Sequence, residues 1–166
     1  ELLKYSFYLG GMHAANALGV WYRDGNGIKR NTKLSIKFFK KAAAKGVHEG
    51  QLNLAYAYAK GIGIKKNLTK SKSWYLKAAK DNKKAQQYVG YCYLYGCSEF
   101  KRAPEIAIKY FRQAAKRGDL EAYYSLGYCY ELGLGTHVNL KLAQKYYQIA
   151  SKEGHQVSKI ALRRIK

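Results

Sequence analysis

The fold is decided by a motif that recurs along the chain with a period of about 36 residues. Its clearest copy, at residues 122–154, reads AYYSLGYCYELGLGTHVNLKLAQKYYQIASKEG. The recurrence is exact in two columns, an aromatic one at Phe39, Tyr75, Phe111 and Tyr147 and an alanine one at Ala42, Ala78, Ala114 and Ala150. A unit of this size forms one supersecondary element that cannot bury its apolar face until it stacks on its neighbours.

Each unit has the pattern of two helices. Apolar residues recur at spacings of three and four, as at Ala107, Phe111 and Ala114, which is helical periodicity. The first helix is expected to end at paired glycines such as Gly25 and Gly27, because glycine adopts the positive φ of a helix C-terminus. The second helix is expected to begin at an N-cap residue, which is Asn31, Asn67, Asn139 or, in the third unit, Ala103 before Pro104.

These patterns predict an all-α fold over residues 1–166, a right-handed α-solenoid of stacked antiparallel helix pairs. Four pairs are expected, at residues 10–45, 46–80, 81–117 and 118–153. Residues 1–9 are predicted to end a helix of an upstream repeat, and residues 154–166 to form a partial repeat or capping helix. Because Glu1 lies inside an incomplete repeat and no Met precedes it, the sequence is expected to belong to a longer or processed chain.

The repeated motif is Ala-x-x-x-Leu-Gly-x-x-Tyr-x-x-Gly-x-Gly, followed by a helix with an aromatic pair and Ala-Ala-x-x-Gly. It resembles the Sel-1-like repeat family, a relative of the tetratricopeptide repeats. The fourth unit carries the motif at Ala122, Leu126, Gly127, Tyr130, Gly133, Gly135, Ala143, Tyr146, Tyr147, Ala150 and Gly154. The third unit departs from it, with Gly96-Cys97-Ser98 in place of Gly-x-Gly. The resemblance implies an adaptor or scaffold with no catalytic activity and no cofactor.

Charge is the feature that the fold does not require. The chain has 31 Lys and Arg residues against 10 Asp and Glu residues, a net charge of +21. Basic pairs precede the second helix of three units, at Lys29, Arg30, Lys65, Lys66, Lys101 and Arg102, and a further basic column stands at Lys37, Lys109 and Lys145. A basic ladder of this kind is predicted to bind RNA phosphates or an acidic protein surface. The alternative is that the lysines only solvate the outer helix face and bind no partner. A membrane surface is disfavoured as a partner, because no exposed apolar helix face lies opposite the basic residues.

A tyrosine column lies on the first helices, at Tyr56, Tyr91 and Tyr128. We expect these helices to line the concave side, where solenoids bind partners, so the three tyrosines are predicted to contact a partner protein or to stack on bases. Another tyrosine column, at Tyr22, Tyr58, Tyr93 and Tyr130, matches the family's core pattern and is predicted to pack inside.

No catalytic or metal site is predicted. The four histidines, His13, His48, His137 and His155, share no column and have no partner at nucleophile or metal spacing. Cys92 and Cys129 share a core column without a paired cysteine in the unit, which favours reduced thiols in the cytosol or mitochondrial matrix. No run of 18 or more apolar residues occurs, so we expect a soluble module.

We therefore predict a non-catalytic scaffold within a larger multi-subunit assembly, with the tyrosine column binding protein and the basic edge meeting RNA or an acidic surface. The alternative is a basic structural subunit of a ribonucleoprotein, such as a mitochondrial ribosome, that binds ribosomal RNA directly. A remote alternative, implied by the resemblance alone, is a hydrolase like some secreted cysteine-rich relatives.

Overall fold

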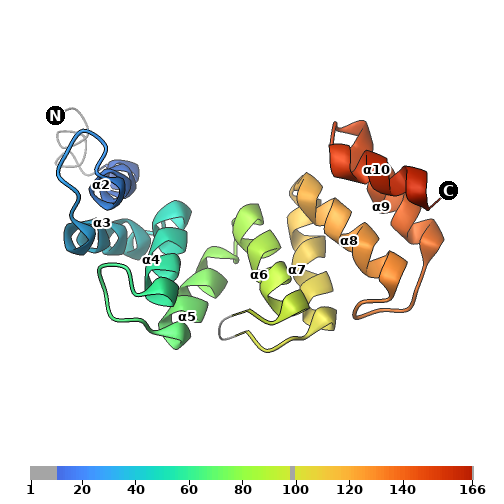
Figure 1. Ribbon diagram of the computed structural model, residues 1–166, viewed down its shortest axis with the longest axis horizontal. Coiled ribbons are helices and arrows are strands. Elements are labelled where there is room, and N and C mark those ends of the chain that lie inside the picture. Colours follow the sequence, from blue (N-terminus) through green and yellow to red (C-terminus); the bar gives the residue numbers. More distant parts are fainter. Residues whose placement is uncertain (1–10, 98–99, 166) are drawn as a thin grey trace. The chain divides into compact units, whose positions relative to one another are not determined.

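A computed structural model describes residues 11–97 and 100–165, and this part of the chain contains helices and no strand. The expectations for residues 1–9, Ser98 and Lys166 lie outside the described residues. The helices, labelled as in Figure 1, are α2 (Met12–Asp24), α3 (Thr32–Ala44), α4 (His48–Lys60), α5 (Leu68–Ala78), α6 (Lys83–Tyr95), α7 (Pro104–Lys116), α8 (Leu120–Leu132), α9 (Leu140–Lys152) and α10 (Gln156–Arg164). None of these helices is long and apolar enough to cross a membrane.

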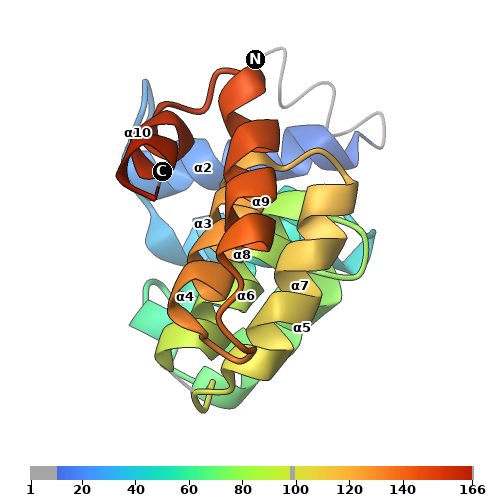
Figure 2. The same cartoon turned by 90° about the vertical axis from the view of Figure 1, so that its right-hand side faces the viewer.

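The chain divides into two compact units, Glu1–Ala78 and Ala79–Lys166. In the first unit, α2 to α5 pack in chain order, each against the next. In the second unit, α6 to α10 do the same, and Figure 2 shows α10 against α9 at the C-terminal side. Helix pairs stacked in this way confirm the predicted class, an all-α solenoid.

The first helices end at glycines, as predicted. Gly25, Gly61 and Gly133 all have left-handed backbone conformations, with φ between 70° and 80°. Gly96 in the divergent third repeat also has a positive φ of 73°, although the second glycine of its motif is missing. In all four repeats the backbone N–H at the start of the second helix then donates to a carbonyl of the first helix, as from Asn139 to Tyr130 at 2.8 Å.

In the first, third and fourth repeats, an aromatic ring of the second helix packs on a glycine of the first helix. A β-carbon added to Gly127 on α8 would lie 2.5 Å from Cε1 of the buried Tyr147 ring on α9. The first and third repeats repeat this contact, with Gly19 against Phe39 and Gly90 against Phe111. In these three repeats a side chain on the glycine would collide with the ring, so the glycine and the aromatic residue form one packing contact. The second repeat has the small residue Ala55 at the glycine position.

The alanine column serves the contact between successive repeats. A β-carbon on Gly50 of α4 would lie 2.7 Å from the β-carbon of Ala42 on α3, and both residues are buried. Small residues on both helices thus allow a close approach of the two backbones.

Candidate binding surfaces

The second unit contains a pocket of about 200 Å³ lined mainly by tyrosines. We call it the tyrosine pocket; its lining residues are Tyr91, Leu94 and Tyr95 of α6 and Tyr124, Ser125 and Tyr128 of α8. The rings stack in pairs along each helix, Tyr91 with Tyr95 at 6.1 Å and Tyr124 with Tyr128 at 6.3 Å between centroids. The structure therefore brings together two predicted tyrosines, Tyr91 and Tyr128, and adds two that the column did not include.

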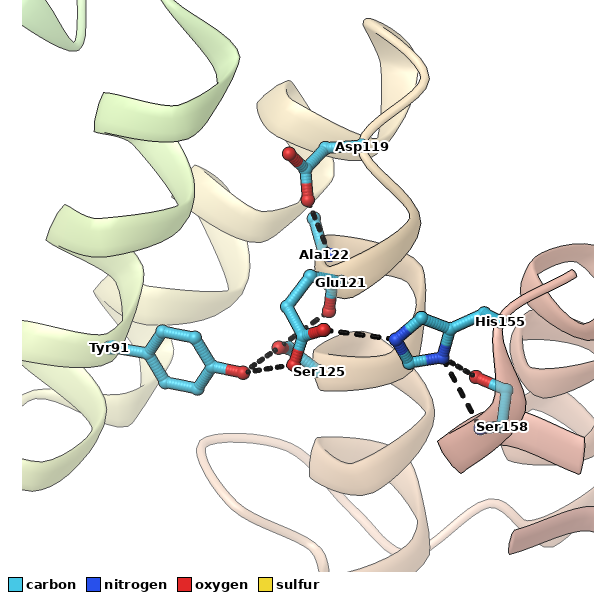
Figure 3. A network of polar contacts seen from close by, with 7 residues as sticks. All are labelled: Tyr91, Asp119, Glu121, Ala122, Ser125, His155 and Ser158. Atoms are coloured by element: carbon cyan, nitrogen blue, oxygen red, sulfur yellow. Dashed lines mark hydrogen bonds and ion pairs between the residues drawn. The ribbon is translucent and has the colours of Figure 1, made fainter. Parts of the chain in front are cut away.

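Tyr91 is the fixed member of this pocket. Its hydroxyl donates to Oε1 of Glu121 at 3.0 Å and lies 3.0 Å from Oγ of Ser125 (Figure 3). Its ring meets that of Phe111 edge-on, with 5.4 Å between centroids. Burial, with the nearby Glu121 carboxylate adding to it, raises the pKa of Tyr91 to about 12, so the phenol stays protonated at neutral pH.

Glu121 also joins α8 to the start of α10. Its Oε2 lies 2.9 Å from Nε2 of His155, while Nδ1 of His155 accepts from the backbone N–H of Ser158 at 3.2 Å and so caps α10. Because Nδ1 is the acceptor, we assign the proton of the neutral ring to Nε2, which donates to Glu121. Figure 3 shows Tyr91 and His155 reaching Glu121 from opposite sides. These contacts of His155 with Glu121 and Ser158 were not expected from the sequence, which was searched only for partners at nucleophile or metal spacing.

The set Ser158, His155 and Glu121 contains the three residue types of a hydrolase triad, but its geometry is that of a helix cap. Oγ of Ser158 lies 2.8 Å from Nδ1 of His155, yet the serine is 0% exposed. A nucleophile must reach its substrate, and a hydroxyl sealed inside the first turn of α10 does not. Among the described residues, no group of three or more His, Cys, Asp or Glu side chains is placed to hold a metal ion.

Tyr56, the third predicted tyrosine, lies on α4 in the first unit and is 44% exposed. It does not line the tyrosine pocket. Of the column predicted to form the core, Tyr58 and Tyr130 are buried as expected, whereas Tyr22 and Tyr93 are half-buried.

The basic loop pairs, Lys29 with Arg30, Lys65 with Lys66, and Lys101 with Arg102, are all exposed. The second member of each pair stands over the glycine that ends the first helix; a β-carbon on Gly61, for example, would lie 3.4 Å from that of Lys66. Arg102 is further held by a hydrogen bond from its Nε to the Leu94 carbonyl at 3.2 Å. The column at Lys37, Lys109 and Lys145 is exposed as well.

One loop pair lines a second pocket, of about 360 Å³, in the first unit. We call it the lysine pocket. Lys65 and Lys66 share it with Lys40 of α3 and Lys70 of α5, around Tyr58, Ile64 and Asn67. The sequence predicted the loop lysines as a binding surface, but it did not predict that Lys40 and Lys70 share a cavity with them.

Comparison with known proteins agrees with this geometry. The model of the Sel1 repeat matches residues 13–47, 48–83, 83–119 and 120–155, which is most of the chain. The chain belongs to the Sel1 repeat family. Two solved structures are similar: a Sel1 repeat protein from Oxalobacter formigenes (32% identity, TM-score 0.82, 91% of this chain and 62% of that chain) and a protective antigen of uropathogenic Escherichia coli with an SLR fold (28% identity, TM-score 0.86, 96% and 34%).

Curated relatives include two fungal regulators of chitin synthase. Chitin synthase regulator SKT5 of Saccharomyces cerevisiae is 32% identical over 152 residues, and chitin synthase regulatory factor 3 of Schizosaccharomyces pombe is 30% identical over 126 residues. These alignments cover 91% and 70% of this chain, but only 17% and 13% of the relatives. Sel1 repeats in such regulators support a protein-interaction scaffold.

Proposed function

We propose that this Sel1 repeat chain is a non-catalytic scaffold that holds a segment of a partner protein on the tyrosine pocket, within a larger assembly. The observation that carries the proposal is that four tyrosines on two helices, α6 and α8, line one cavity, and that one of them, Tyr95, is 60% exposed. Tyrosine contributes a large, stiff contact area and a hydroxyl, which is why it is frequent among the residues that dominate binding energy. Tyr91 is already fixed by Glu121 and Ser125, so its part of the pocket loses little conformational entropy on binding.

The test replaces tyrosines of the pocket whose substitution should leave the fold intact. Tyr91 is unsuitable, because its hydrogen bonds and its contact with Phe111 tie it to the core. Replacing Tyr95 and Tyr128 with Ser should reduce recovery of co-purifying proteins at least about tenfold, since each such anchor is worth more than about 1 kcal/mol. The matched control is Tyr88→Ser, an exposed tyrosine on α6 outside the pocket. Equal recovery with parent and double variant would refute the proposed protein contact.

A second surface is supported by charge. The chain carries +21, and the exposed loop pairs recur at 36-residue intervals, so we propose that they contact a phosphate backbone or an acidic protein surface. If the phosphate backbone belongs to a permanently bound RNA, the chain is a structural subunit of a ribonucleoprotein. Cys92, Cys97 and Cys129 form no disulfide among the described residues, which supports a reducing compartment such as the cytosol or mitochondrial matrix.

RNA contact has a specific salt signature. Each phosphate neutralised on a single strand contributes a slope of about −0.7 to the plot of log affinity against log salt. Reversing Lys29, Lys65 and Lys101 to Glu should therefore make the slope shallower by about 2 and weaken binding to unrelated sequences alike. The control reverses Lys80, Lys116 and Lys152, which are also exposed and spaced by 36 residues, so the net charge change is the same. Equal slopes for the two triple variants would mean that net charge, and not the loop edge, governs binding.

A further inference from the structure

The lysine pocket of the first unit concentrates positive charge in one cavity. Its four lysines come from three separate elements: Lys40 from α3, Lys65 and Lys66 from the loop, and Lys70 from α5. Its lining residues, among those that the structure describes, include no carboxylate. At about 360 Å³ the cavity is within the range of small-molecule sites, about 300–1,000 Å³.

Acidic side chains are too few in this part of the sequence to neutralise the pocket. Residues 11–78 contain only Asp24 and Glu49 as carboxylates. Asp24 forms an ion pair with its neighbour Arg23, with 2.7 Å between Oδ1 and Nε. Glu49 lies in the first turn of α4, at the opposite end of this helix from the pocket residue Tyr58. Ammonium groups that face one cavity without a counter-charge repel one another, and a bound anion relieves that repulsion.

Two contacts organise the pocket before any ligand arrives. The ammonium of Lys70 lies over the Tyr58 ring, 5.8 Å from its centroid, in a cation–π contact that favours one position for this side chain. Asn67 caps α5 by accepting from the Lys70 backbone N–H at 2.8 Å and donates its own N–H to the Tyr58 carbonyl at 2.9 Å. The cap occupies that backbone donor, so the ligand would be held by the lysine ammonium groups, with the dipole of α5 adding to the positive potential.

The same positions in the second unit carry different residues. The equivalent of Lys40 there is Arg112, whose Nη2 is hydrogen-bonded to the Tyr130 hydroxyl at 2.5 Å. Counterparts of Lys65, Lys66 and Lys70 are His137, Val138 and Leu142. Four lysines around one cavity are therefore a property of this chain's first unit and do not follow from the repeat motif.

We propose that the lysine pocket binds a compact phosphate-class polyanion, with two or more adjacent phosphate groups. Closely spaced phosphates suit a cavity that is lined by four lysines from three elements, whereas a single phosphate or a carboxylate would pair with only some of these lysines. The proposal goes beyond the scaffold function and does not rest on it, because a small anion can occupy the pocket whether or not the loops meet RNA.

The test is isothermal titration calorimetry of the full chain at about 150 mM salt, where long-range surface attraction is screened. Tripolyphosphate is the main probe, and orthophosphate and a nucleoside triphosphate are the comparison arms. We expect one site per chain, with tripolyphosphate bound more tightly than orthophosphate. Equal binding of tripolyphosphate and the nucleoside triphosphate would show that the phosphates alone are recognised, and tighter binding of the nucleotide would show a contribution from the nucleoside.

The variant Lys66→Gln/Lys70→Gln should weaken tripolyphosphate binding at least about tenfold, since it removes two charge-assisted contacts. The matched control is Lys29→Gln/Arg30→Gln, the loop pair of the preceding repeat, which should leave affinity nearly unchanged. Several weak sites, or equal weakening by both variants, would show only diffuse attraction and would overturn the proposal. If tripolyphosphate binds at one site but the two triple variants show equal salt slopes for RNA, the pocket proposal stands and the proposed RNA contact of the loop pairs is refuted.

Discussion

At the scale of single residues, three of the four repeats have a glycine that makes room for an aromatic ring, at Gly19, Gly90 and Gly127. Gly127 contacts the Tyr147 ring, and the ring cannot move aside freely because its hydroxyl donates to Oε2 of Glu131 at 2.7 Å. Glu131 also forms an ion pair with Arg164, with 2.7 Å between Oε1 and Nη2. Burial and the hydrogen bond to Glu131 raise the pKa of Tyr147, so its hydroxyl remains a donor over the ordinary pH range.

Gly127→Leu should therefore destabilise the chain by about 1–3 kcal/mol or more, the usual effect of overpacking. For a chain of this length that lowers the melting midpoint by about 2–4 °C per kcal/mol. The control Gln148→Leu adds the same side chain at an exposed position of α9 and should change the midpoint little. A midpoint for Gly127→Leu equal to that of the parent would refute the packing of Gly127 on Tyr147.

The cysteines offer a second residue-scale prediction. Burial raises the pKa of Cys129 to about 12, so at pH 8 only about one thiol in ten thousand is ionised. Cys92 is also buried, whereas Cys97 is half-buried. We expect a thiol reagent to label Cys97 first and to reach Cys92 and Cys129 only after denaturation, with the fast phase absent in Cys97→Ser. Labelling of all three at one rate in the folded chain would contradict the assigned burial.

At the scale of elements, helix starts differ in how they are capped. The side chains of Asn31 and Asn139 accept from the backbone N–H three residues later, each at 2.9 Å. Ala103 has nearly the same backbone conformation, with φ −154° and ψ 78° against φ −147° and ψ 88° at Asn139, but has no side chain to accept. The residue before α7 in the third repeat thus has the backbone conformation of an N-cap but no side-chain oxygen to accept a hydrogen bond.

Reciprocal substitutions test this difference. Asn139→Ala should cost about 1 kcal/mol, and Ala103→Asn should stabilise the chain by up to a similar amount, because the backbone there already has the N-cap conformation. The gain is bounded because the N–H of Ile106 already donates to the Ala103 carbonyl at 3.0 Å. Urea unfolding of the two variants and the parent measures both effects, and a loss of stability in Ala103→Asn would count against the cap geometry.

The positions of the helices could be predicted from the sequence because each helix end is marked at equivalent positions in four repeats. A departure in one repeat therefore does not hide the pattern. Even in the third repeat, Gly96 ends α6 as its column predicts. The tyrosine pocket was predicted only in part, because the column shows equivalent positions in successive repeats and not the neighbours one turn away, Tyr95 and Tyr124. The contact of His155 with Glu121 was not predictable from columns, because it joins non-equivalent positions 34 residues apart.

At the scale of the whole molecule, the two units differ in surface chemistry. Residues 11–78 carry their basic side chains with only Asp24 and Glu49 as carboxylates, and this unit contains the lysine pocket. The second unit uses Glu121 and Glu131 to join its helices and contains the tyrosine pocket. We propose two separate binding functions on one repeat chain, a protein contact and a polyanion contact.

The most direct test is quantitative co-purification with and without nuclease, using the parent, the Tyr95→Ser/Tyr128→Ser variant and the Lys29→Glu/Lys65→Glu/Lys101→Glu variant. The account predicts that partner proteins survive nuclease treatment with the parent and are lost with the tyrosine variant, while the lysine variant retains them and loses RNA. Partner proteins that disappear on nuclease treatment of the parent, and are unaffected by the tyrosine variant, would contradict a protein-binding scaffold and favour a subunit held by RNA.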